Sequence, residues 1–183
     1  MADFVRFIQQ MDMESNGKRI HVDGSEVAID TGPVVWGGPG IDGQHAYFQL
    51  LHQGTQRMPI DFIGVQHDAT PLPLASEHHR ITLLNLRAQA QALATGRTPE
   101  ATKAMLQAQG LDAEHLTPHR SFPGNVPSNI LWLPKLDPDH LGALIAAYEH
   151  KVFYQAAIWG IHAYDQWGVE LGKTLAQSMD KGA

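Results

Sequence analysis

The stretch PIDFIGV, residues 59–65, is a short apolar segment that begins at a proline and is followed by polar residues. Its length and its aromatic and β-branched residues favour a strand that is buried on both faces, as strands of parallel sheets are. Two other stretches have the same character, PVVW at 33–36 and NILWL at 129–133. The sequence therefore predicts three buried strands.

Helical stretches separate these predicted strands. A long helix is expected from Ser76 to Thr95, where Gly96 would end it, and another is expected from a cap at Asp137 to about Ile158. Further helices are predicted over 4–11, 43–52, 98–110 and 165–179, with Thr98 as the cap of the third and a loop over 68–75. Strands that alternate with helices favour a parallel sheet covered on both faces. We therefore predict an α/β fold in which residues 1–183 form a single domain.

Composition excludes several classes of protein. The 183 residues include 13 basic and 19 acidic side chains, so the formal charge is 13 − 19 = −6, and no basic cluster suggests a nucleic-acid partner. The absence of cysteine excludes disulfides and thiolate chemistry. No apolar run is long enough to span a membrane, and no signal-peptide pattern is present. We expect a cytoplasmic protein without a membrane partner.

Several polar residues are candidates for chemistry, and each also has an ordinary structural explanation. Gln166, Glu170 and Lys173 would share one face of the last predicted helix, as residues of a solvated surface also do. His45 would lie in the first turn of the helix that Asp42 is predicted to cap, where the helix dipole disfavours a positive imidazole. A surface histidine would fit the same pattern. Spacing alone therefore assigns no role to these residues.

The remaining patterns give little support to other reaction classes. Glu14 lies between a predicted helix and a turn, where a solvent-exposed carboxylate is the ordinary explanation. His115 and His119 have a spacing that metal ligands use, but Pro118 is expected to interrupt a continuous helix between them. Because the sequence also lacks cysteine and an HExxH pattern, we expect no metal site. It contains no GxSxG, Walker or GxGxxG motif.

The decapeptide YDQWGVELGK, residues 164–173, is more specific than any of these spacings. At every defined position it resembles the C-terminal signature of the glucose-6-phosphate isomerase (phosphoglucose isomerase) family. MESNGK at 13–18 is similar to the family's catalytic-glutamate segment, GQHAYFQLLHQGT at 43–55 to its histidine helix, and LGALIAAYEHKVF at 141–153 to its penultimate helix. The likeness extends from about Gln9 to the end of the chain and corresponds to the C-terminal third of family members.

The resemblance implies roles for five residues. Glu14 matches the glutamate that moves a proton between C1 and C2 of the sugar, and Lys173 matches a lysine near the ring and hydroxyl oxygens. His45 matches the histidine that assists ring opening and reaches into the partner subunit's site. Gln10 and Gln166 match glutamines that contact substrate. We therefore expect a cofactor-free aldose–ketose isomerase of glycolysis and gluconeogenesis, which interconverts glucose 6-phosphate and fructose 6-phosphate through a cis-enediol.

The resemblance also implies a three-layer αβα sandwich with a mostly parallel sheet, of the sugar-isomerase (SIS) type, and a homodimer in the intact enzyme. The family's phosphate-binding loops and its enediolate-stabilising arginine have no counterpart in these residues, so we expect the chain alone to have little activity. The alternative is a non-catalytic module that binds sugar phosphates or supports assembly. Four positions depart from the family pattern, where Gly38 replaces a glutamate, Ile41 and Asp42 replace a Thr-Asn pair, and Val126 replaces an arginine; the segment 68–77 also matches poorly.

Overall fold

The computed structural model describes residues 1, 3–67 and 70–181, and the chain divides into two compact units. The terminal unit comprises residues 1–38 and 141–183, and the sheet unit comprises residues 39–140. The single domain expected over 1–183 stays a prediction. The first two residues of the loop predicted over 68–75 lie outside the described residues.

The sheet unit is built around two parallel strands. Ile60 lies opposite Ser128 at one end of the pair, and His67 lies opposite Lys135 at the other. The parallel pairing predicted for these two strands is therefore confirmed. In chain order, the elements of the sheet unit are α2 (Gly40–Ala46), α3 (Phe48–Gln53), β1 (Ile60–His67), α4 (Ala75–Thr95), α5 (Pro99–Ala108), α6 (Ala113–Arg120) and β2 (Ser128–Lys135).

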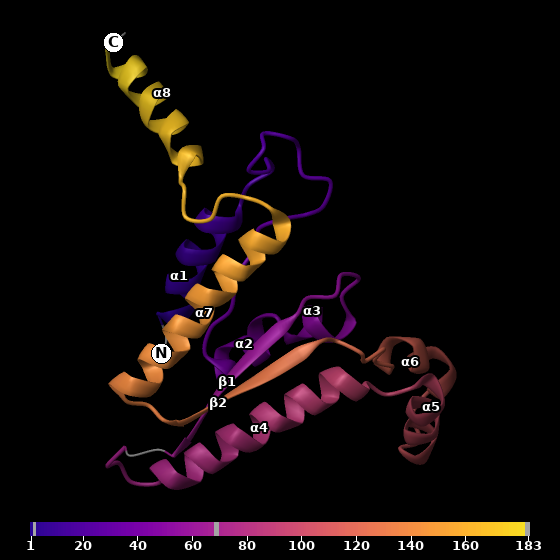
Figure 1. Ribbon diagram of the computed structural model, residues 1–183. Coiled ribbons are helices and arrows are strands. Elements are labelled where there is room, and N and C mark those ends of the chain that lie inside the picture. The colour runs from indigo at the N-terminus through magenta and orange to yellow at the C-terminus, as the bar shows by residue number, and fades with distance from the viewer. Residues whose placement is uncertain (2, 68–69, 182–183) are drawn as a thin grey trace. The chain divides into compact units, whose positions relative to one another are not determined.

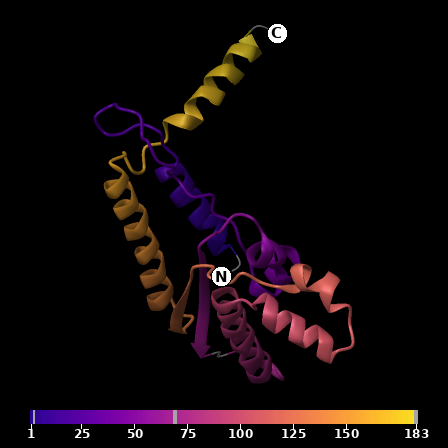
Figure 2. The same cartoon turned by 90° about the vertical axis from the view of Figure 1, so that its right-hand side faces the viewer.

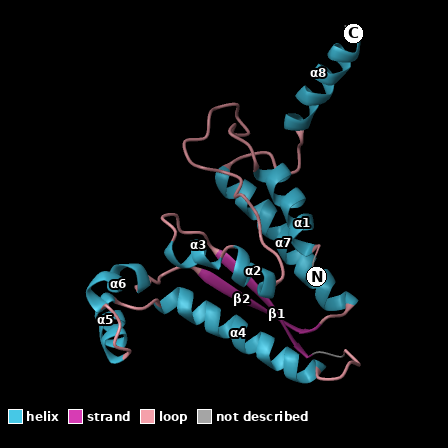
Figure 3. Ribbon diagram, turned by 180° about the vertical axis from the view of Figure 1, so that it is seen from behind, coloured by secondary structure: helices cyan, strands magenta, loops and turns pink. Residues whose placement is uncertain are grey.

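Helices cover both faces of this strand pair. Figure 1 shows α4 on one side of β1 and β2, with α2 and α3 on the other, and Figure 3 shows the same layers from behind. The core between these elements contains Phe48, Leu51, Leu93 and Val126, all buried. The unit therefore has the predicted α/β/α layering, and the valine that departs from the family pattern is one of its core residues.

The terminal unit consists of helices. Its elements are α1 (Phe4–Ile8), the π-helix η1 (Gln9–Glu14), α7 (Pro138–Trp159, whose first turn belongs to the sheet unit), the 3₁₀-helix η2 (Trp167–Val169) and α8 (Glu170–Lys181). Every fourth residue of α7 is buried, at Leu144, Tyr148, Val152 and Ala156. This stripe faces α1 and η1, which lie beside α7 in Figures 1 and 2, and the Phe4 and Tyr148 rings meet edge to face at 5.4 Å.

Three of the capping signals in the sequence are confirmed. Gly96 ends α4 with φ +62°, a left-handed conformation that glycine adopts without steric cost. The Thr98 hydroxyl accepts a hydrogen bond from the backbone N–H of Ala101, at 3.2 Å, and so caps α5. The carboxylate of Asp137 accepts from the backbone N–H of His140 at 2.9 Å and caps α7. These signals act within a few residues, which is why the sequence displays them.

Two predictions for the N-terminal region are wrong. Residues 33–36 do not form a strand, and the side chain of Val34 is 75 % exposed, so this apolar run lies at the surface instead of in a sheet. The helix predicted over 4–11 is longer than expected, because it continues through η1 and the chain stays helical to residue 16. Glu14 is therefore helical and does not lie in a turn.

Two predicted helices differ from those expected, one because it is divided and one because it starts later. The helix expected over 43–52 is two short helices, because Tyr47 adopts φ −140° and breaks the chain between α2 and α3. The helix expected over 165–179 begins only at Glu170, after the short 3₁₀ turn. Gln166 therefore does not share a helical face with Lys173. Among the described residues, no helix combines the length and the apolar character that crossing a membrane requires.

Candidate active site

Glu14 is the last residue of the π-helix η1, and its side chain is half-buried. Single π-helical turns within helices occur frequently at functional sites, because the wider turn displaces side chains from ordinary helical positions. The Nζ of Lys18 donates to the backbone carbonyls of Glu14, at 3.1 Å, and of Ser15. A cation therefore caps the carboxyl end of this helix. Burial lowers the pKa of Lys18, and the charge of Asp165 partly opposes that shift.

An open pocket of about 330 Å³ lies beside η1 in the terminal unit. It brings together three of the five predicted site residues, the carboxylate of Glu14 and the amides of Gln10 and Gln166. The complete lining is Phe7, Gln10, Met11, Glu14, Ser15, Tyr164 and Gln166. The pocket thus combines one carboxylate with uncharged hydrogen-bonding groups and an apolar wall.

The segment after α7 carries Gln166 to this pocket. Tyr164 adopts φ +68°, an uncommon left-handed conformation for a residue with a side chain. Its hydroxyl donates to the backbone carbonyl of Glu149 on α7, at 3.1 Å, which fastens the turn to that helix. Burial, with a contribution from the charge of Glu149, raises the pKa of Tyr164. Gln166 therefore reaches the pocket from a non-helical segment.

The other two predicted site residues lie elsewhere. Lys173 is exposed in the first turn of α8 and is not among the residues that line the pocket. His45 is exposed on α2, in the sheet unit, whereas the pocket belongs to the terminal unit. The first-turn position expected for His45 is wrong, because α2 begins at Gly40 and places His45 in its last turn. The helix dipole there favours a positive charge and does not disfavour it.

The chemistry available to the pocket follows from its lining. Amide and hydroxyl groups can exchange hydrogen bonds with a polyhydroxy ligand, and a half-buried carboxylate can remove a proton that is held close to it. None of the described lining residues carries a positive charge. A phosphate group or a developing enediolate would therefore need cations from outside this lining.

The histidine pair on α6 is arranged differently from the prediction. Pro118 lies inside α6 without interrupting it, and the His115 and His119 rings lie 5.5 Å apart on adjacent turns. The helix extends to Arg120. Within the described ranges, no group of three or more side chains is arranged to hold a metal ion.

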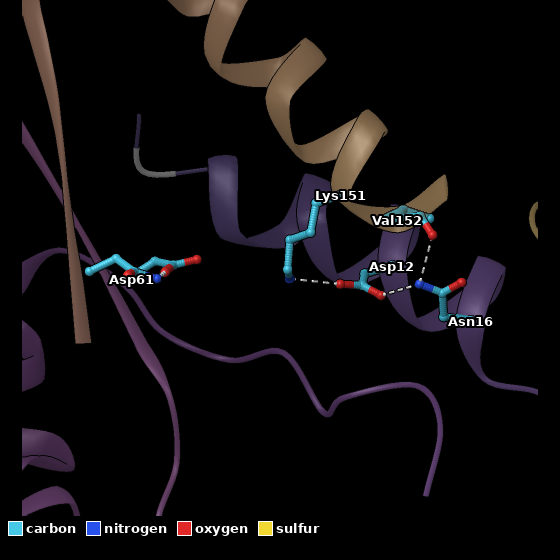
Figure 4. Close-up of polar contacts among 6 residues, drawn as sticks. Asp12, Asn16, Asp61, Lys151 and Val152 are labelled. Atoms are coloured by element: carbon cyan, nitrogen blue, oxygen red, sulfur yellow. Dashed lines mark hydrogen bonds and ion pairs between the residues drawn. The ribbon is translucent and has the colours of Figure 1, made fainter. Parts of the chain in front are cut away.

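A buried polar network next to Glu14 was not predicted from the sequence. Asp12 and Asn16 have no exposed surface, and Figure 4 shows Asp12 between Asn16 and Lys151. The i, i+4 spacing of Asp12 and Asn16 on one helical face is a local signal that could have indicated their hydrogen bond. No local signal links either residue to Lys151, because that contact joins distant parts of the sequence.

Comparisons with known proteins identify the relatives of this chain. A family profile described as "Phosphoglucose isomerase" matches residues 1–183. The chain is 52 % identical to Glucose-6-phosphate isomerase 1 of Neisseria gonorrhoeae over 177 residues, which is 95 % of this chain and 32 % of that protein. It is also 52 % identical to glucose-6-phosphate isomerase of Deinococcus deserti, over 99 % of this chain and 33 % of that protein.

Solved structures agree with these sequence comparisons. The crystal structure of a glucose-6-phosphate isomerase from Chlamydia trachomatis matches with a TM-score of 0.83 and 39 % identity, over 98 % of this chain and 32 % of that one. A hypothetical protein from Thermus thermophilus, TT0462, matches with a TM-score of 0.58 and 21 % identity, which is a likeness of fold alone. The chain thus spans about a third of the length of the curated relatives it matches.

Proposed function

This chain belongs to the phosphoglucose isomerase family, and we propose that it carries the proton-transferring part of an enzyme that interconverts glucose 6-phosphate and fructose 6-phosphate. The observation that carries this proposal is the pocket lined by Glu14, Gln10 and Gln166. These are the residues that the family pattern assigns to proton transfer and to substrate contact. They come from two segments near opposite ends of the chain and line one pocket.

The proposed reaction moves one proton between two carbon atoms of the open sugar. The cyclic sugar first opens, as the proton of the C1 hydroxyl is lost and the ring oxygen gains one. The Glu14 carboxylate then removes the proton from C2 of the open aldose, the electrons of that C–H bond form the C1–C2 double bond, and the C1 carbonyl oxygen gains a proton, which gives a cis-enediol. Glu14 then returns its proton to C1 while the C2 hydroxyl loses its proton, which leaves a hydroxyl at C1 and a ketone at C2, the product. No electrons leave the sugar, so the sequence of steps needs no redox cofactor.

The two glutamines have a binding role in this proposal. Their amides can donate to and accept from sugar hydroxyls, which holds C1 and C2 within reach of a single carboxylate. The pocket walls formed by Phe7 and Met11 favour the less polar parts of the sugar. The proposal therefore separates the proton carrier, Glu14, from the groups that orient the substrate.

His45 and Lys173 have roles that need a more complete site. We assign His45 to ring opening in the site of a second subunit, in a homodimer, and Lys173 to the oxygens of the ring and hydroxyl groups. Both side chains are exposed, as groups that act across an interface or on a bound ligand would be before assembly. Ring opening needs a group that both accepts and donates a proton, which imidazole does near neutral pH.

The 183-residue chain alone is expected to have little activity. Because none of the described pocket residues is cationic, nothing in this lining can offset the charge of the phosphate or the enediolate. Loss of one preorganised electrostatic group lowers turnover by about 100- to 1,000-fold. The cations that offset these charges would come from segments other than those that line this pocket.

A comparative assay tests this proposal. The conversion of fructose 6-phosphate would be measured for the protein at its natural length and for the 183-residue chain alone. We expect isomerisation by the former and turnover at least about 100-fold lower for the latter. No isomerisation by the natural protein would contradict the isomerase assignment and favour the non-catalytic binding or assembly module. Near-normal turnover by the chain alone would contradict the incomplete site.

A further inference from the structure

We propose that Asp12 is a positioning residue, whose buried carboxylate fastens η1 to α7 and thereby directs Glu14 into the pocket. This inference rests on the proposed role of Glu14 as the proton carrier. It concerns a residue that lies two positions before Glu14 and does not line the pocket. Asp12 would therefore act through Glu14 and not on the substrate.

The contacts of Asp12 join η1 to α7. Its side chain has no exposed surface, and its Oδ2 lies 3.2 Å from the Nζ of Lys151. Its Oδ1 accepts a hydrogen bond from the Nδ2 of Asn16 at 3.0 Å, and the same Nδ2 lies 3.3 Å from the backbone carbonyl of Val152. Figure 4 shows both connections between the two helices. The network therefore includes a charged and an uncharged link to α7.

Glu14 lies between Asp12 and Asn16 in the sequence, so a network that holds these two residues also orients the Glu14 side chain. Asp12 precedes Glu14 by two residues and Asn16 follows it by two, and both are completely buried. Residues two apart on a helix do not share a face. A network that fixes Asp12 and Asn16 against α7 therefore holds the intervening Glu14 side chain on another face of the helix, where it lines the pocket.

Stability alone does not account well for a charged pair at this place. The Asp12 carboxylate is fully buried and the Lys151 side chain is 40 % exposed, so the attraction of the pair is offset by the hydration that the carboxylate loses. Its attraction and hydrogen bonds are directional, however, and an apolar contact is not. Because a displacement of about 1 Å at a catalytic group can cost roughly 100-fold in rate, directional anchoring of the Glu14 segment would matter for catalysis.

Isomerase kinetics of the protein at its natural length test this proposal. Asp12→Asn keeps the shape and removes the charge, Lys151→Met removes the partner, and Lys151→Arg keeps a cation. We expect the first two variants to lower kcat per folded molecule by about 10- to 100-fold with KM changed less than about threefold. Lys151→Arg should retain most of the activity. The double variant of the first two should lose no more than either alone, because both break one connection.

Glu26→Gln is the matched control, because it removes an ion pair of 2.7 Å in the same unit whose side chains are exposed. It should leave kcat unchanged. Hydrogen exchange over residues 9–18 should become faster in Asp12→Asn and stay unchanged in the control. If Asp12→Asn does not fold, the comparison of Lys151→Met with Lys151→Arg carries the test.

The outcomes separate this inference from the proposed function. Suppose that the natural-length protein isomerises normally and that Asp12→Asn and Lys151→Met keep the wild-type kcat per folded molecule. That result would overturn the positioning role and leave the proposed function intact. Equal losses in Lys151→Met and Lys151→Arg would also overturn it, since the charge would then be irrelevant. A natural protein without isomerase activity would overturn the proposed function, and the catalytic positioning role with it.

Discussion

Glu14 and Gln166 line the same pocket, although they lie near opposite ends of the chain and in different elements. The structure therefore joins two segments that are separate in the family resemblance. In one pocket, a carboxylate and an amide can have separate roles: the carboxylate moves a proton, and the amide binds a hydroxyl group. The first prediction tests this division.

Replacing Gln166 with alanine should weaken substrate binding more than turnover. One uncharged hydrogen bond contributes about 0.5–1.5 kcal/mol, so KM is expected to rise roughly 2- to 10-fold with a smaller change in kcat. Steady-state kinetics of the natural-length protein measure both. Gln109→Ala, at an exposed position of the sheet unit, is the control and should change neither. A Gln166 variant that lost kcat alone would contradict the binding role.

Mixed dimers test the proposed place of His45. Subunits with Glu14→Gln and subunits with His45→Ala should each form nearly inactive dimers. If His45 acts in the partner's site, a hybrid dimer has one doubly altered site and one intact site, so an equal mixture should recover roughly a quarter of normal activity. If His45 acts within its own subunit, no hybrid site is intact and the mixture should stay inactive. The assay follows activity after the subunits are mixed and reassociated.

The stability of the chain should depend on the charge of Asp137 at moderately acid pH. The ammonium group of Lys135, at 2.8 Å, holds the pKa of Asp137 well below its usual range, with further contributions from the backbone N–H and ring of His140. Because this pKa is depressed by folding, the stabilisation is complete above the unfolded value near pH 4 and is lost as the pH falls below it.

Thermal unfolding of Asp137→Asn and wild type between pH 7 and pH 3 measures this effect. The wild type should have the higher Tm at pH 7, and the difference should narrow below about pH 4. A Tm difference between wild type and Asp137→Asn that stayed constant across this range would contradict the prediction.

Gly32 is predicted to be essential for the packing around the Glu14 segment. It has φ +66°, and a Cβ there would lie 2.7 Å from the Cα of Gly17 and 2.9 Å from the carbonyl oxygen of Asn16. Gly24 also has a positive φ, of +86°, but a Cβ there would meet no atom within 4 Å. The two glycines therefore share the backbone cost of a substitution and differ in the steric cost.

Alanine substitutions at Gly24 and Gly32 should separate the backbone cost from the steric cost. Gly24→Ala should lose about 1–2 kcal/mol from the left-handed backbone alone. Gly32→Ala should lose about 1–3 kcal/mol more through overpacking, and should lower isomerase activity because it displaces the backbone next to Asn16. Denaturant unfolding measures the stability of each variant. Equal losses in the two variants would contradict the predicted close approach.

The sequence predicted the features that depend on neighbouring residues or on a specific family pattern. The caps at Gly96, Thr98 and Asp137 act over a few residues, and they are found where the pattern placed them. The parallel pairing of the two longer strands was also predicted. Gln10 and Glu14 are four residues apart in the sequence, but their meeting with Gln166 is not visible in spacing and was implied only by the family resemblance.

Features that depend on tertiary contacts were not predicted. The apolar run 33–36 was expected to be buried, but burial depends on a partner surface, and Val34 is mostly exposed. The start of α8 was placed too early, because the positive φ of Tyr164 and the short 3₁₀ turn delay the helix. The contact between Asp12 and Lys151 has no local signal of any kind.

The central claim is that Glu14 carries the proton, and Glu14→Gln tests it most directly. The variant keeps the size of the side chain and can still form hydrogen bonds, but its neutral amide cannot act as a base. Turnover and the dissociation constant for fructose 6-phosphate would be measured on the natural-length protein. We predict that kcat falls by about 100- to 10,000-fold while the dissociation constant changes less than about threefold. Retained turnover, or a loss of binding as large as the loss of turnover, would contradict the assignment of Glu14 as the proton carrier.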